Sequence, residues 1–192
     1  MLTVLRGLPG AGKSAVADEL GRRLEAMVLS VDPIEAAIWR AGIAPSFETG
    51  VAAYEVAAAV AREQLRLGHD VVVDAVNAYE VIHALWERVA TRCGLVMSVV
   101  EVVCSDLDLH RRRLEARVRD IDGFPEPTWD EVVDKQRDWQ PWPGGALVLD
   151  SVEPLAANVE RAVRYLGSSN ASPGHRLADG PCHELSRSLG WS

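Results

Sequence analysis

The chain has few of the features that mark a secreted, membrane-bound or metal-binding protein. Its three cysteines, Cys93, Cys104 and Cys182, cannot all pair, and their spacing matches no zinc-binding pattern. No apolar run approaches the roughly 18 residues of a membrane span. The amino terminus leads directly into an apolar, strand-like segment, so no signal peptide is expected. These absences predict a cytoplasmic protein without a membrane partner.

Basic side chains are also scarce, apart from one short segment. The net charge is −8, and the only dense basic stretch is residues 110–119 (HRRRLEARVR). Proteins that grip a polynucleotide usually present a basic face, because neutralising phosphates supplies most of their affinity. This stretch is long enough to hold one triphosphate and too short to follow a strand. The composition therefore favours a small-molecule partner and makes a nucleic acid unlikely.

The most specific motif in the sequence is the run GLPGAGKS, which matches G-x-x-x-x-G-K-[ST] at every fixed position. It lies between a strand-like and a helix-like segment, as the motif requires. Glycines let successive backbone N–H groups point into one concavity, and the following helix adds its positive end. The residues predicted to contact a nucleoside triphosphate are Gly7, Leu8, Pro9, Gly10, Ala11, Gly12, Lys13, Ser14 and Ala15.

Strand-like and helix-like segments alternate along the chain. Strands are predicted at 2–6, 27–31, 71–74, 95–104 and 146–149, and helices at 13–25, 33–40, 48–67, 79–93, 106–120, 128–138 and 155–166. This order predicts an α/β fold with a mostly parallel sheet and right-handed crossovers. Beyond residue 166 the periodicity ends, so we expect one domain over 1–166 and a flexible tail over 167–192.

Two aspartates follow predicted strands, at the edge where ligands of parallel sheets bind. Asp74 ends an apolar strand. A carboxylate at this place either orients Mg²⁺ together with Ser14 or caps the turn that follows, with Asn77 as N-cap of the next helix. Asp32 follows the second strand and suits a base that accepts a proton from an acceptor hydroxyl. It equally suits a helix start, with Pro33 and Glu35 behind it.

Arginines and aromatic residues complete the candidate site. Arg113 and Arg117 are four residues apart and form either a clamp for a triphosphate or a solvated helix face. Lys13 reaches the β- and γ-phosphates in this motif. The segment that covers the acceptor pocket contains Trp39, Arg40 and Tyr54, as pocket lining or as core.

Several segments together resemble a known group of enzymes. The GLPGAGKS loop, Asp32, the GHDVVVDAVN strand end, the WERVA helix and the RRRLEARVRD stretch occur in this order. Residues 1–166 resemble the small P-loop kinases that include the 5′-hydroxyl polynucleotide kinase domain and chloramphenicol phosphotransferase, with zeta-toxin kinases as more distant relatives. The resemblance implies a P-loop NTPase fold with a five-stranded parallel sheet of nucleoside-monophosphate-kinase type.

The resemblance also implies roles for individual residues. Asp32 corresponds to the base that activates the acceptor, while Lys13, Ser14 and the lid arginines Arg113 and Arg117 correspond to ATP-binding residues. Polynucleotide kinases usually carry an arginine shortly after the catalytic aspartate, whereas this chain has Glu35, with Arg40 a turn beyond.

The predicted function is ATP- and Mg²⁺-dependent transfer of a phosphoryl group to a hydroxyl of a small molecule such as an antibiotic, nucleoside or sugar. The acceptor pocket is expected to include Asp32, Glu35, Trp39, Arg40, Tyr54 and Asn77. Two alternatives share the ATP site: a polynucleotide 5′-hydroxyl kinase, and a non-catalytic ATP-binding switch protein.

Overall fold

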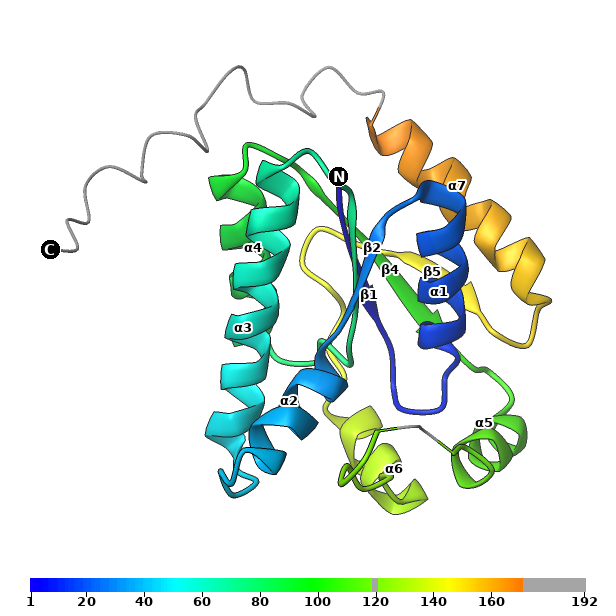
Figure 1. The fold of residues 1–192 in the computed structure, drawn as a ribbon. Helices are drawn as coiled ribbons and strands as arrows, with labels where there is room; N and C mark the ends of the chain where they lie inside the picture. The colour runs from blue at the N-terminus through cyan, green and yellow to red at the C-terminus, as the bar shows by residue number, and fades with distance from the viewer. Residues whose placement is uncertain (119–120, 171–192) are drawn as a thin grey trace, which may run out of the picture.

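The computed structural model describes residues 1–118 and 121–170 (Figure 1). Its strands are β1 (Leu2–Arg6), β2 (Met27–Ser30), β3 (Val71–Asp74), β4 (Met97–Val103) and β5 (Leu147–Asp150). Its helices are α1 (Lys13–Leu24), α2 (Val31–Arg40), α3 (Phe47–Arg66), α4 (Glu80–Arg92), α5 (Leu107–Glu115), α6 (Trp129–Arg137) and α7 (Leu155–Asn170). No helix in the described residues is long and apolar enough to cross a bilayer.

The five strands form one parallel sheet in the order β2-β3-β1-β4-β5. All carboxyl ends therefore lie at one edge, which faces α2, α5 and α6 (Figure 1). Asp74 pairs in register with Leu5 on one side and Ser30 on the other. The sheet thus places the end of β3 between the start of the glycine-rich turn and the start of α2.

Two apolar layers hold helices against the two faces of the sheet. Val71 and Val73 belong to the core layer under α3 and α4, and Val72, between them, belongs to the layer under α1 and α7. This alternation follows from the opposite directions of successive side chains in a strand. A run of three valines is buried on both sides for this reason, as is common in parallel sheets. The result is a rigid support beneath the carboxyl-terminal edge.

The predicted α/β fold and five-stranded parallel sheet are confirmed, whereas several predicted boundaries are wrong. The second helix begins at Val31, two residues before Pro33. Helix α5 ends at Glu115, well short of the predicted residue 120. Helix α7 continues to Asn170, beyond the predicted end at residue 166. The remainder of the predicted tail, 171–192, lies outside the described residues.

Candidate active site

The turn between β1 and α1 has a backbone path that its glycines allow. A Cβ at Gly7 would lie 2.4 Å from the carbonyl oxygen of Val102 in β4, closer than real Cβ atoms come. Gly10 and Gly12 have φ values of +82° and +95°, which side chains disfavour. Gly12 is the N-cap of α1, so the first N–H groups of this helix are free to meet a ligand.

A buried histidine supports this turn from α5. The Nε2–H of His110 donates to the carbonyl of Pro9 at 2.8 Å, and the ring meets Trp129 edge-on at 5.2 Å. A Cβ at Gly10 would lie 3.1 Å from the Cβ of Leu114, so α5 contacts the turn closely. Sequence reasoning missed His110, because nothing in an arginine-rich helix separates a buried histidine from its exposed neighbours.

One cavity of about 570 Å³ lies between the turn, β5 and the start of α7, and we name it the β5–α7 cavity. It is lined by Gly10, Gly12, Lys13, Ser14, Ala15, Val16, Arg113, Arg117, Ser151, Val152, Glu153, Pro154, Leu155 and Asn158. Arg113 is fixed there, because its guanidinium donates to the Oγ of Ser151 at 2.8 Å and to the Ser151 carbonyl at 3.1 Å. Several donors therefore converge on this cavity.

A second cavity, of about 410 Å³, lies between the turn, α2 and α3, and we name it the α2–α3 cavity. Its polar lining includes Asp32, Glu35 and Tyr54, and its other walls come from α3, the start of α4 and the α5–α6 loop. Lys13 and Arg117 line both cavities. Lys13 is 5% exposed. These two cations mark the junction between the two spaces.

Asp32 lies inside the first turn of α2, and Ser30 occupies the N-cap position. The predicted capping role of Asp32 is therefore wrong, because the helix begins two residues earlier than that role requires. Asp32 and Glu35 lie one helical turn apart and both line the α2–α3 cavity. Burial and the charge of Asp32 raise the pKa of Glu35.

Asp74 is buried at the carboxyl end of β3. One carboxylate oxygen accepts a hydrogen bond from the Oγ of Ser30 at 3.4 Å. The other oxygen is buried and has no hydrogen-bond partner in the described residues. An unpaired buried carboxylate oxygen is costly unless a cation or water meets it. In the described residues, no group of three or more His, Cys, Asp or Glu side chains could hold a metal.

Asn77 is fully buried, so it does not line either cavity. Its side-chain NH₂ donates to the carbonyl of Leu5 at 2.6 Å, and its Oδ1 accepts from the indole of Trp86 at 2.9 Å. The N-cap of α4 is Tyr79. The predicted capping role of Asn77 is therefore wrong, and its burial and hydrogen bonds give it a structural role instead of a place in the cavity lining. It links β1 to α4 and supports the glycine-rich turn from below.

Tyr54 lies beneath the α2–α3 cavity. Its hydroxyl oxygen accepts a hydrogen bond from the backbone N–H of Asn77 at 3.2 Å. Burial raises the pKa of this phenol strongly, and the charges of Asp32, Glu35 and Asp74 add to the effect. Tyr54 therefore stays protonated at neutral pH and acts as a hydrogen-bond donor toward the cavity.

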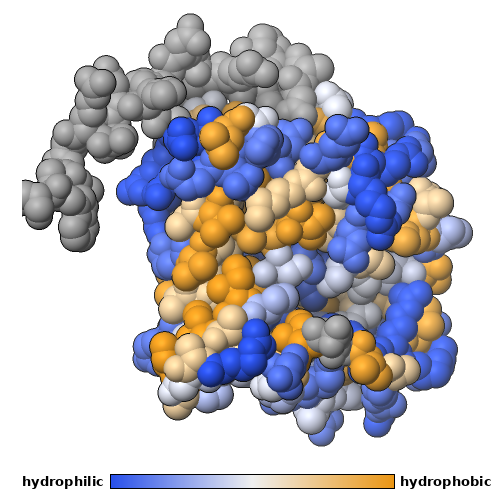
Figure 2. Space-filling model, in the orientation of Figure 1, coloured by the Kyte–Doolittle hydropathy of each residue, from blue (hydrophilic) through white to orange (hydrophobic). Residues whose placement is uncertain are grey.

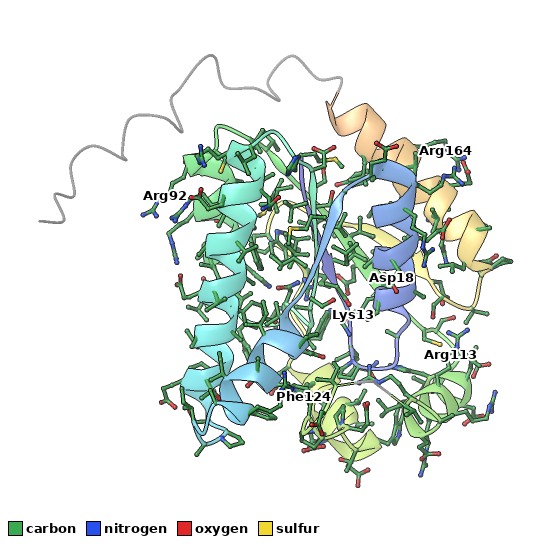
Figure 3. All side chains as sticks on the ribbon, in the orientation of Figure 1. Lys13, Asp18, Arg92, Arg113, Phe124 and Arg164 are labelled. Carbon is green, nitrogen blue, oxygen red and sulfur yellow. The ribbon has the colours of Figure 1, made fainter. Side chains whose placement is uncertain are left out.

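The α5–α6 loop crosses the α2–α3 cavity and contacts α2. Trp39 stacks on Phe124 of this loop with ring centroids 4.7 Å apart, and Arg40 donates to the carbonyl of Asp122 at 3.0 Å. Figure 3 shows Lys13 at the start of α1 and Phe124 below α2. Arg40 is exposed and does not line the cavity, so its place in the acceptor pocket stays a prediction.

Arg117 lies beyond the end of α5. Its guanidinium contacts Glu126 through Nε at 2.9 Å and Nη2 at 2.7 Å. The predicted common helix face of Arg113 and Arg117 is therefore wrong, because the helix stops at Glu115. Both arginines nevertheless line the β5–α7 cavity.

The parallel sheet and the glycine-rich turn define the class of P-loop NTPases with a kinase-like arrangement of helices. A family model described as an AAA domain matches residues 2–142, and the chain belongs to this family. The chain has the fold of small P-loop kinases, as the sequence predicted. No curated protein sequence matches the chain significantly.

Solved structures share the fold at low sequence identity. Kti12 from Chaetomium thermophilum, in complex with ADP-AlF3, is 19% identical with a TM-score of 0.67, over 90% of this chain and 100% of that chain. A sugar kinase from Janibacter sp. has 15% identity and a TM-score of 0.66, over 86% and 94%. APS kinase from Mycobacterium tuberculosis, with AMPPNP and APS, has 22% identity and a TM-score of 0.64, over 86% and 96%.

Proposed function

We propose that this chain is an ATP- and Mg²⁺-dependent phosphotransferase that acts on a hydroxyl group of a small molecule. The observation that carries the proposal is the meeting of two cavities at Lys13 and Arg117. One cavity has the donors that a polyphosphate needs, and the other has carboxylates that accept protons. A phosphoryl group held at the junction faces both spaces.

The β5–α7 cavity is the nucleotide site in this proposal. Backbone N–H groups of the turn and the positive end of α1 bind the phosphates, and Lys13 neutralises the group that is transferred. Arg113, held by Ser151, and Arg117 stabilise charge on the phosphate oxygens. The complexes of two similar folds with ADP-AlF3 and AMPPNP support nucleotide binding by this fold.

The residues around the turn also fit a magnesium ion. Ser14 lines the β5–α7 cavity, and Asp74 offers a buried carboxylate oxygen that no other described residue contacts by a hydrogen bond. A Mg²⁺ ion is usually held by one or two such oxygens together with phosphates and water, so a larger acidic cluster is not required. When bound, the ion supplies Lewis-acid neutralisation of the phosphate charge.

Asp32 is the proposed base in the α2–α3 cavity. Its carboxylate receives the proton of the acceptor hydroxyl while the hydroxyl oxygen forms a bond to the γ-phosphorus, and the bond from the γ-phosphorus to the β-γ bridging oxygen breaks to release ADP. Tyr54 donates a hydrogen bond to the acceptor, and the α5–α6 loop excludes water. Excluding water limits the competing hydrolysis of ATP.

The proposal is tested by a screen of alcohols coupled to ADP release, with phosphorylated product identified by mass spectrometry. We expect Lys13→Ala and Asp32→Asn each to lower kcat at least about 100-fold. Only Lys13→Ala is expected to weaken ATP binding strongly. Full turnover by Asp32→Asn contradicts its role as base.

The same screen, with two added measurements, also tests the two alternative functions. No transfer to any alcohol, together with nucleotide-dependent capture of a protein, favours a switch protein. Transfer to the 5′ end of short DNA or RNA, with steep salt dependence, favours a polynucleotide kinase. The net charge of −8 and the carboxylates of the α2–α3 cavity weigh against the latter.

A further inference from the structure

The α2–α3 cavity has walls suited to an apolar, ring-bearing molecule. Phe47 meets Tyr79 edge-on at 6.4 Å on one side, and the stacked pair of Trp39 and Phe124 closes the other. About half of the remaining lining residues are aliphatic or proline, among them Val31, Val51, Ile82 and Pro125. Figure 2 shows apolar surface along α3, and Phe47 at its start is 67% exposed.

One carboxylate in this cavity has no hydrogen-bond or ion-pair partner among residues 1–118 and 121–170. Glu35 is half-buried and makes no hydrogen bond or ion pair with any described residue. Its Oε1 lies 3.4 Å from the place of a Cβ at Gly50, so the missing side chain on α3 leaves room for this carboxylate. A carboxylate held beside Asp32 without a hydrogen bond or a direct ion pair favours binding of a cation or a hydrogen-bond donor.

The cations near the cavity do not meet this requirement. Arg117 is already paired with Glu126 at 2.7 Å. Lys13 stands at the junction with the β5–α7 cavity. Lys135 on α6 attracts Glu35 electrostatically but is exposed and forms no ion pair with it. Glu131, an acidic residue of the same lining, already has a partner, because its carboxylate accepts a hydrogen bond from the backbone N–H of Thr128 at 2.7 Å and caps α6.

We infer that the acceptor is an amino alcohol with an apolar, ring-bearing body. Its hydroxyl lies at Asp32 and its protonated amine lies at Glu35, and this assignment rests on the proposed phosphotransfer. Residues three apart on a helix have Cβ atoms about 5–6 Å apart, which suits a hydroxyl and an amine on adjacent or next-adjacent carbons. Acceptors that carry a carboxylate, sulfate or phosphate near the hydroxyl are repelled by Glu35.

The test uses acceptors that share a hydroxyl and an apolar body and carry different charges. The amines are phenylalaninol and tryptophanol, with leucinol as an amine without a ring, and their neutral partners are the N-acetyl derivatives. The anionic acceptor is 3-phenyllactate, which has the benzyl group of phenylalaninol and a secondary hydroxyl. With saturating Mg²⁺-ATP, we expect kcat/KM for the amines to exceed that of the N-acetyl partners by about 10-fold or more. We expect 3-phenyllactate to be the poorest acceptor.

Variants of Glu35 test whether this carboxylate causes the preference for amines. Glu35→Gln is expected to reduce the preference for the amine to about 2-fold or less, and Glu35→Lys to favour 3-phenyllactate. Glu87→Gln is the control, because Glu87 is exposed on α4, outside both cavities, and the substitution removes the same charge. Melting temperatures of all variants show that each is folded.

The outcomes separate this inference from the function on which it rests. Equal turnover of amine and N-acetyl partners by the wild type overturns the amino-alcohol assignment, as does an unchanged preference in Glu35→Gln. Phosphotransfer to other alcohols stands in either case. If the chain phosphorylates no alcohol in the broad screen, the proposed function itself fails. Preference for 3-phenyllactate by the wild type also overturns the assignment.

Discussion

Glu35 is held in a place that is electrostatically unfavourable for a carboxylate. Desolvation raises its pKa most, the charge of Asp32 raises it further, and Lys135 opposes both. The buried phenol of Tyr54 is close enough for its own pKa to respond to the same charges. Groups that lower stability in the free protein and serve a ligand are common at functional sites.

The pKa of Glu35 leads to a prediction about stability and pH. A raised pKa means that the folded state takes up a proton at a higher pH than the unfolded chain. The free energy of unfolding therefore falls as pH rises from the unfolded pKa, about 4.3, through the folded one, and the cost is constant above it. We expect Glu35→Gln to be more stable than the wild type by up to about 1 kcal/mol at pH 7–8, or roughly 2–4 °C in Tm.

Thermal melts across pH 4 to 8 measure this effect. The gain from Glu35→Gln should grow with pH and disappear below about pH 4, where the carboxyl is protonated in both states. Glu87→Gln, on the exposed side of α4, should show no such trend. A gain that is largest at low pH contradicts the assigned direction of the shift.

Single residues also show where sequence reasoning fails. The GLPGAGKS motif located the turn correctly, because each glycine in it has a backbone conformation that side chains disfavour. Asn77 was placed at a helix start from its position after a strand, but it has φ +50° and its side chain bridges Leu5 and Trp86. Those partners lie 72 and 9 residues away, so a local pattern does not reveal them.

At the scale of elements, the contact between α2 and the α5–α6 loop closes the α2–α3 cavity. The Trp39–Phe124 stack and the bond from Arg40 to the Asp122 carbonyl join the two segments. The indole N–H of Trp39 also donates to the Oγ1 of Thr49 at 3.0 Å, which ties it to α3. This loop is thus positioned by side chains of the helix that bears the proposed base.

Loss of the aromatic stack is expected to weaken acceptor binding. An aromatic pair contributes about 0.5–1.5 kcal/mol beyond its buried area, so Phe124→Ala should raise the KM for the acceptor about 2- to 12-fold or more. The affinity for ATP should change little, because Phe124 does not line the β5–α7 cavity. Steady-state kinetics and a nucleotide titration measure the two effects separately.

Two further variants sharpen this prediction. Trp39→Ala removes the same stack from the side of α2 and should give a similar rise in KM. Arg88→Ala, on α4, removes an exposed ion pair with Glu55 on α3 and should leave KM unchanged. An unchanged KM in both aromatic variants shows that the loop does not close over the acceptor.

Errors in the predicted helix boundaries explain why some site residues lie at other places in their helices than predicted. The apolar pattern located every helix, but it placed the start of α2 at Pro33, whereas Ser30 is the N-cap. It also carried α5 through residue 120, although the helix ends at Glu115. Arginine has a good helix propensity, so RRRLEARVR reads as helix throughout, and only tertiary contacts such as that of Arg117 with Glu126 show where it stops.

For the whole molecule, the strand order decides which groups meet. Alternating segments predicted the parallel sheet, but the strands are short and mostly apolar, so their sequences do not specify their neighbours. The order β2-β3-β1-β4-β5 sets β3 between β1 and β2 and brings Asp74 beside Ser30 and the glycine-rich turn. The same order brings Ser151, after β5, to within 3.2 Å of a Cβ at Gly12.

Nucleotide binding should stabilise the whole fold and raise its Tm through mass action. A ligand that binds only the folded state stabilises it by about 2.7 kcal/mol at 100 times its Kd, which corresponds to roughly 5–11 °C in Tm for a chain of this size. We expect this rise for the wild type and for Asp32→Asn with Mg²⁺-AMPPNP, because Asp32 lines only the α2–α3 cavity. Lys13→Ala should lose most of the rise, since its ammonium group lies where both cavities meet. Differential scanning calorimetry at several ligand concentrations distinguishes these cases, and an equal rise in Lys13→Ala places the nucleotide elsewhere.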